Sequence, residues 1–125
     1  MGLYHTTKKS FYYAFSGIKT AYKNEPNLSI HTVLAISALT LGLILNITAI
    51  EWLILAFTIF YVITLELLNT VIESVVNLVS PDIQPQAKIA KDVSAACVLL
   101  AAITAVIVGL VIFLPRILQL LILKQ

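Results

Sequence analysis

A stripe of polar side chains inside an apolar, helix-length segment restricts this chain more than any other feature. In residues 65–78, which read LELLNTVIESVVNL, Glu66 is followed by Asn69, Glu73 and Asn77 at offsets of 3, 7 and 11. On an α-helix these side chains fall within roughly an 80° arc, and leucine, isoleucine and valine cover most of the remaining surface. A charged side chain near the centre of a bilayer costs about 2.5–3.5 kcal/mol, so the stripe has to face protein, water or a ligand. We interpret it as a functional site; hydrogen bonding between helices is the alternative.

The composition places this segment in a membrane. Of the 125 residues, 60% are hydrophobic and only 11% are charged, and the mean hydropathy is +1.00. Soluble domains contain about 25% charged residues, so the chain is predicted to be an integral membrane protein, and its length allows one domain over residues 1–125. The excess of eight Lys and Arg over six Asp and Glu is too small and too scattered to indicate a nucleic-acid partner.

The first predicted element is an amphipathic helix over about residues 6–24. Its apolar face would be formed by Phe11, Phe15, Ile18 and Tyr22. Aromatic residues on one side and lysines on the other are typical of a helix that lies on a membrane surface; a helix packed only against its own protein is the alternative. The residue before a proline is disfavoured in the α conformation, so the helix should end at Asn24-Glu25-Pro26 and leave Glu25 at an elbow.

Three membrane spans are predicted after this helix. They cover about residues 28–45, 50–78 and 87–114, with a short turn and a polar, proline-containing loop between them. Pro115 and Arg116 should close the last span, and Cys97, the single cysteine, is expected to line its core. The expected fold class is an all-α integral membrane protein with an N-terminal amphipathic surface helix and three transmembrane helices.

Lysines are concentrated in the N-terminal helix and at the start of the last span. By the positive-inside rule, the N-terminus and the loop at 80–87 are cytoplasmic. This topology brings Glu25, the end of the polar stripe and the pair Lys91-Asp92 to one cytoplasmic membrane surface.

Carboxylates, a lysine and amides at one membrane surface indicate a site for a magnesium-bound phosphate. Mg²⁺ is usually held by one or two carboxylates together with substrate phosphates. Lys91, in the first turn of the last span, adds a cation and the positive end of a helix. The alternatives are that Lys91 only anchors the helix and that Asp92 only pairs locally. The four glycines are too dispersed for a glycine-rich phosphate loop, so side chains and a metal ion would have to hold any nucleotide.

Three stretches of the sequence resemble blocks of one known family. ELLNTVIESVVN, NEPNLSIH and AKDVSAA are similar to blocks of the prokaryotic diacylglycerol kinases, small three-span lipid kinases that include the undecaprenol kinases, and the likeness extends over roughly residues 8–116. The resemblance implies that the chain uses ATP and Mg²⁺ to phosphorylate a lipid alcohol at the bacterial inner (plasma) membrane. It also implies a homotrimer with active sites shared between subunits. A ridge of small residues, Ala101, Ala105 and Gly109, offers a face on which another helix can pack closely.

The resemblance also implies roles for single residues. Glu66 would be the base that faces the lipid hydroxyl, and Glu25 and Glu73 would hold the magnesium ions. The nucleotide and its metal would be bound by a larger set, namely Gly17, Glu25, Asn69, Glu73, Asn77, Lys91 and Asp92. Asn77 stands where the family usually has aspartate, and the missing charge is expected to affect nucleotide or metal affinity there.

The lipid substrate is predicted from two further details. Asn27 and His31, with the ending IFLPR, resemble the undecaprenol kinases more than the diacylglycerol-preferring enzymes, so undecaprenol is the expected acceptor. Diacylglycerol, which would give phosphatidic acid, is the alternative. Outside this class, the chain would be a non-catalytic oligomeric membrane protein, or a family member that is inactive because of Asn77.

Overall fold

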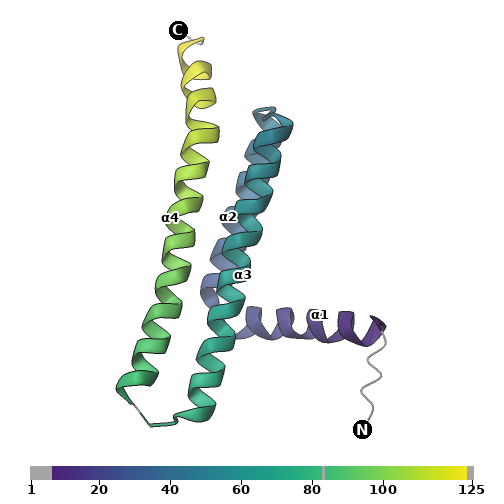
Figure 1. Ribbon diagram of the computed structural model, residues 1–125. Coiled ribbons are helices and arrows are strands. Elements are labelled where there is room, and N and C mark those ends of the chain that lie inside the picture. The colour runs from purple at the N-terminus through teal and green to yellow at the C-terminus, as the bar shows by residue number, and fades with distance from the viewer. Residues whose placement is uncertain (1–6, 83, 124–125) are drawn as a thin grey trace.

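Helices make up almost all of the chain that the structure, a computed structural model, describes, namely residues 7–82 and 84–123 (Figure 1). They are α1 (Thr7–Asn24), α2 (Pro26–Ile44), α3 (Ala49–Val79) and α4 (Pro85–Ile122), and no strand occurs within these residues. Within the same residues, α2, α3 and α4 are the helices long and apolar enough to cross a membrane. The predictions of an all-helical chain and of three candidate spans are confirmed.

The elbow between α1 and α2 turns α1 across the long helices (Figure 1). Glu25 has an extended backbone (φ −117°, ψ 99°), and Pro26 opens α2. Because proline lacks an N–H and fixes φ, it suits the first turn of a helix and keeps the preceding residue out of the α conformation. The predicted elbow at Glu25 is therefore confirmed, whereas the predicted start of α1 at residue 6 lies outside the described residues.

The predicted apolar face of α1 is open in the single chain. Phe11 is 61% exposed and Phe15 is 70% exposed. Beyond α1, the end of α3 and the start of α4 project further, with the loop that joins them at the tip (Figure 1). Contact between α1 and a membrane surface stays a prediction.

A tight turn joins α2 to α3 at the opposite end. Asn46 has a left-handed backbone (φ 48°), and the backbone N–H of Thr48 donates to the Glu51 carboxylate at 2.7 Å in a capping box that starts α3. Next to the turn, Gly42 lies against the Trp52 ring, where a Cβ on residue 42 would be only 2.9 Å from the nearest ring atom. Glycine is needed there because the two helices approach closely.

Arg116 ties α4 to the start of α3. Its guanidinium donates to both carboxylate oxygens of Glu51, each at 2.7 Å, and to the Ile112 carbonyl at 2.9 Å. The prediction that Pro115 closes the last span at Leu114 is wrong, because α4 continues through Pro115 to Ile122. A proline removes one backbone hydrogen bond, and neighbouring groups can compensate for it in membrane helices.

The small residues of α4 face the inside of the chain. Ala101 is fully buried, and α4 packs most extensively against α3. Ala105 and Gly109 border a groove between the helices. Close packing is thus seen at Ala101, against helices of the same chain, whereas Ala105 and Gly109 border open space and their packing against another helix stays a prediction. Cys97 is exposed, so the expectation that it lines the core is wrong.

Candidate active site

Glu66 lies inside the bundle, at the point where α2 and α3 meet. Only 2% of the residue is exposed, and Nε2 of His31 in α2 lies 3.0 Å from its Oε1 atom. Despite this proximity, Oε1 accepts no hydrogen bond from the described residues. A buried carboxylate oxygen without a donor is costly, and such positions are rare in folded proteins. Oε1 therefore faces His31 and has no other donor within the described residues.

Asn69, one turn further along α3, joins the polar stripe to α4. Its amide nitrogen donates to Oε1 of Glu73 at 3.1 Å, and its Oδ1 atom accepts a hydrogen bond from Oγ of Ser94 at 2.6 Å. Ser94 is itself buried and also donates to the Lys91 carbonyl at 3.0 Å. The two bonds of Asn69 fix the orientation of its amide and hold the Glu73 carboxylate in place.

The carboxylates proposed as metal ligands lie in the neighbourhood of Glu66. Glu25 and Glu73 are both half-buried, and both are close enough to Glu66 for their charges to act on it. Within residues 7–82 and 84–123, no group of three or more His, Cys, Asp or Glu side chains is arranged to hold a metal ion. Two carboxylates fit Mg²⁺ nonetheless, because that ion commonly takes its remaining ligands from water and from substrate phosphates.

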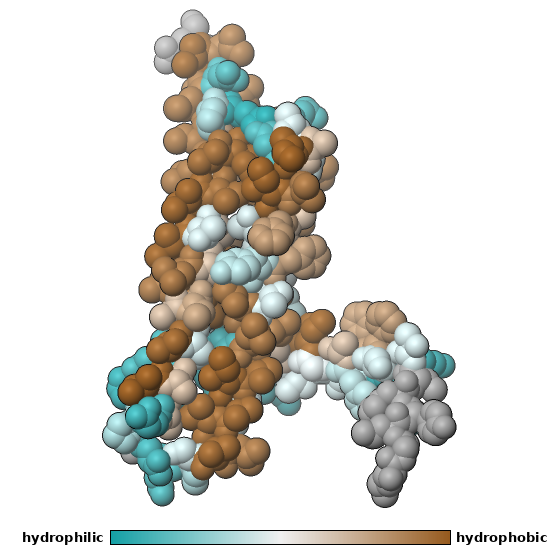
Figure 2. Space-filling view, in the orientation of Figure 1, coloured by the Kyte–Doolittle hydropathy of each residue, from teal (hydrophilic) through white to brown (hydrophobic). Residues whose placement is uncertain are grey.

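A polar cavity of about 290 Å³ lies between the end of α3 and the start of α4. It contains three of the residues predicted to bind nucleotide, Asn77, Lys91 and Asp92. Nζ of Lys91 donates to Oδ1 of Asn77 at 2.7 Å, and Asp92 forms an ion pair with Lys88. Figure 2 shows hydrophilic surface over the start of α4, beside hydrophobic surface at the end of α3. The structure thus brings these residues together, and both lysines already have partners there.

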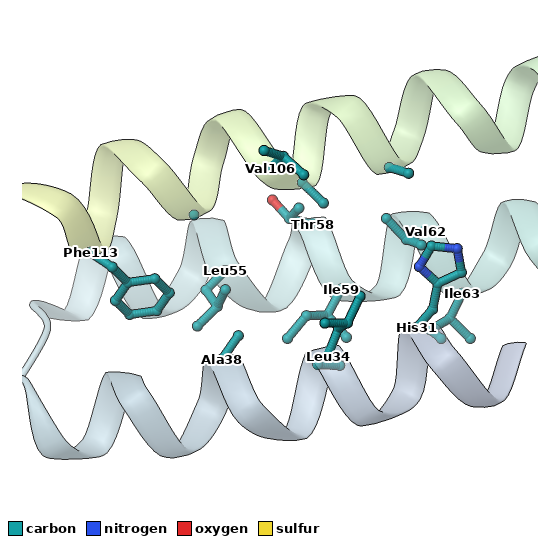
Figure 3. A pocket seen from close by; sticks show the side chains of 14 residues that line it. His31, Leu34, Ala38, Leu55, Thr58, Ile59, Val62, Ile63, Val106 and Phe113 are labelled. Atoms are coloured by element: carbon teal, nitrogen blue, oxygen red, sulfur yellow. The ribbon is translucent and has the colours of Figure 1, made fainter. Parts of the chain in front are cut away.

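An apolar groove of about 250 Å³ leads away from His31 between α2, α3 and α4 (Figure 3). His31 lies at one end of it and Phe113 at the other. The side chains between them are aliphatic apart from Thr58, whose hydroxyl is bonded to the Ile54 carbonyl at 2.8 Å. The wall on α4 is low because it is formed partly by Ala102, Ala105 and Gly109.

The sequence assigned no role in the reaction to two residues that contact the polar stripe, His31 and Ser94. One residue that was predicted to bind nucleotide, Gly17, has no contact there that the structure shows. His31 and Ser94 contact the polar stripe, although sequence alone gave His31 no role in the reaction and did not single out Ser94. The signal for Ser94 was its place one turn after Lys91 in the AKDVSAA block. Gly17 is exposed on α1, where an added Cβ would have no heavy atom within 4 Å, so packing does not explain this glycine.

Comparisons with known proteins identify the family that the sequence resembles. A family model described as prokaryotic diacylglycerol kinase matches residues 12–113. A protein of Synechocystis named diacylglycerol kinase is 46% identical over 114 residues, which are 90% of this chain but 65% of that protein. The undecaprenol kinase of Bacillus subtilis is 40% identical over 86% of this chain and 88% of its own length. The diacylglycerol kinase of Escherichia coli is 32% identical over 76% of this chain and 78% of its own length.

Proposed function

The chain belongs to the prokaryotic diacylglycerol kinase family, a family of lipid kinases, and on that basis we propose that it transfers the γ-phosphate of ATP to the hydroxyl group of a membrane lipid alcohol. One observation carries the proposal. Among the described residues, the buried Glu66 carboxylate contacts only His31 through Oε1, and His31 in turn lines the end of an apolar groove. A lipid alcohol has the matching shape, since it carries one hydroxyl group at the end of a hydrocarbon chain.

Glu66 acts as the general base in this proposal. Its Oε1 atom accepts the proton of the lipid hydroxyl while the hydroxyl oxygen attacks the γ-phosphorus and ADP leaves. The site is buried, so a charge on the carboxylate is poorly solvated, and this favours proton uptake. The apolar groove holds the first part of the hydrocarbon chain and orients the hydroxyl toward the carboxylate.

The phosphates lie along the polar stripe in the proposed complex. Glu73 is about 10 Å from Glu66 along α3, and Asn77 is about 16 Å away, so the stripe is long enough to follow a triphosphate outward. Glu25 and Glu73 would hold Mg²⁺, which when bound neutralises charge on the phosphates. Asn69 positions Glu73, and Lys91 turns from Asn77 to a phosphate oxygen. Asp92 and Gly17 complete the nucleotide site.

Undecaprenol is the proposed acceptor lipid. The Bacillus subtilis relative is named undecaprenol kinase and matches this chain over most of both lengths. The relative named diacylglycerol kinase in Synechocystis has a higher identity but is covered over only 65% of its length. In addition, His31, one of the residues that carries the resemblance to the undecaprenol kinases, lies directly beside Glu66. In the proposal, this residue would therefore lie at the acceptor site.

Phosphate transfer in mixed micelles tests the assignment. Purified protein would be given ATP and Mg²⁺ with undecaprenol or with diacylglycerol, and Glu66→Gln would serve as the inactive control. We expect transfer to undecaprenol at the higher rate. A higher rate with diacylglycerol would reject undecaprenol as the preferred acceptor. No transfer by a correctly folded protein would favour a non-catalytic membrane protein or a family member inactivated by Asn77.

A homotrimer in the bacterial plasma membrane, with the active site on the cytoplasmic side, completes the proposal. Glu25 and Glu73 are only half-buried in the single chain, so a nucleotide bound there would be open to solvent on one side. Apolar side chains also continue along α3 past the level of α1, where Leu78 and Val79 are 83% and 77% exposed. Figure 2 shows this hydrophobic surface at the tip. Exposed apolar patches of this kind mark contacts with other protein or with membrane.

A further inference from the structure

His31 and Glu66 form a pair in which one member is buried and the other reaches the surface. The side chain of Glu66 is 3% exposed and that of His31 is 20% exposed. Oε1 and Nε2 are 3.0 Å apart, which is within the range for proton transfer. A single proton between these two atoms would complete the contact.

The surroundings make the imidazole the natural destination for that proton. The other charged groups that act on Glu66 are the carboxylates of Glu25, at the elbow, and Glu73, on α3. On α1, the titratable Tyr22 bonds to Thr32 instead. The charged residues at the start of α4 are engaged elsewhere, since Lys91 binds Asn77 and Lys88 pairs with Asp92. Within the described residues, His31 is the only ion-pair partner of Glu66.

We infer that His31 receives the proton that Glu66 removes from the lipid hydroxyl and passes it toward solvent. This inference rests on the proposed kinase function. The O–H bond of the lipid breaks as its oxygen bonds to the γ-phosphorus, and the bond from that phosphorus to the β–γ bridging oxygen breaks with its electron pair leaving on ADP. The proton goes to Oε1 of Glu66, then to Nε2 of His31, and from the partly exposed ring to water. Glu66 is thereby returned to its charged form for the next turnover.

The relay gives His31 a defined place in the reaction. His31 acts through Glu66, so it is a positioning residue rather than a catalytic one. Without it, a proton taken up by a buried carboxylate has to leave through apolar surroundings, where moving charge is unfavourable. An imidazole suits the task because it gains and loses protons near neutral pH.

Two substitutions of His31 separate a relay from a structural role. His31→Ala should lower kcat at least tenfold. Acid–base groups contribute about 10²–10⁴-fold, and a residue that acts through another group should contribute no more than that. The Kd for MgATP should be unchanged. Added imidazole should restore turnover to His31→Ala, and more so as the pH rises and the added imidazole loses its proton. Leu34→Ala is the matched control, because it opens space in the same groove without removing a base, and imidazole should not affect it.

His31→Gln provides an independent reading, since glutamine keeps a polar side chain of similar size. His31→Gln should lower kcat as His31→Ala does, because glutamine cannot carry a proton, while the KM for the lipid and the Kd for MgATP stay unchanged. An unchanged kcat in His31→Gln, or a folded His31→Ala that imidazole does not rescue, would overturn the relay. If His31→Ala does not fold, the kcat of His31→Gln decides. Failure of the wild type to phosphorylate either lipid would instead count against the kinase function.

Discussion

Glu66 and Glu73 lie two turns apart on one face of α3, but their surroundings prepare them for different tasks. Glu66 is enclosed, and its Oε1 atom contacts His31 at the end of an apolar groove. Glu73 is half-buried and accepts a hydrogen bond from the side-chain amide of Asn69. An enclosed carboxylate suits proton transfer, and a more open, oriented carboxylate suits a hydrated metal ion.

This difference predicts distinct defects for two amide substitutions. Glu66→Gln keeps the size of the side chain but removes its basicity, so turnover should fall about 10²–10⁴-fold while the affinity for MgATP stays close to normal. Glu73→Gln should instead weaken MgATP binding, because an amide is a poorer ligand for Mg²⁺. Titration calorimetry with MgATP measures the binding, and the micelle assay measures turnover. An equal loss of MgATP affinity in both variants would show that the two carboxylates belong to one metal site.

Asn77 permits a second test at this scale. Its amide oxygen already accepts a hydrogen bond from Lys91 in the polar cavity. Asn77→Asp adds a charge that can help hold Mg²⁺, and at an exposed position one charge contributes about 1 kcal/mol at 4 Å, so MgATP should bind about fivefold more tightly. Calorimetry would detect this change. Weaker binding would mean that the new carboxylate keeps Lys91 away from the phosphates.

The helices show which parts of the fold the sequence could predict. Pro26 and Pro85 each open a helix, as expected, because proline restricts its own backbone and that of the preceding residue whatever surrounds them. The prediction that the last helix ends at Pro115 was wrong. The helix continues past Pro115, and the next residue, Arg116, contacts Glu51, which lies 65 residues away along the chain and could not be inferred from local spacing. His31 and Ser94 were missed as site residues for the same reason. Their partners come from other helices, and spacing along one helix does not reveal them.

The groove makes a prediction at the level of helix packing. Gly109 borders it, and a Cβ there would meet no heavy atom within 4 Å, so Gly109→Ala should have little effect. Gly109→Leu should fill the groove, and because overpacking costs about 1–3 kcal/mol, the KM for the lipid should rise about five- to 150-fold. The Kd for MgATP should not change. A normal lipid KM in a folded Gly109→Leu protein would exclude the groove as the path of the hydrocarbon chain.

The whole molecule leaves more apolar surface uncovered than a membrane alone explains. At the tip of α3, beyond α1, Leu78 is 83% exposed on the side of the membrane where the site is expected to meet water. We expect a second subunit to cover this apolar tip.

The trimer can be measured directly. The mass of the protein in detergent should be three times the 13.7 kDa of one chain after the detergent is subtracted. Leu78→Asp should reduce the trimer fraction, because it places a charge in the proposed contact, whereas Gln86→Asp, at the exposed start of α4, should not. Native mass spectrometry or light scattering would report both. A wild type that is only monomeric would contradict the shared site.

The clamp between Arg116 and Glu51 has a consequence for how the groove can change its width. A loop joins α3 and α4 at one end, and the ion pair between Arg116 and Glu51 joins them near the other, so these two helices are held together at both ends. α2 packs less extensively on α3 than α4 does. We therefore expect any widening of the groove to come mainly from a movement of α2, the helix that carries His31 at the groove. A long-chain alcohol would then enter the groove laterally, past α2, without leaving the hydrocarbon core of the bilayer.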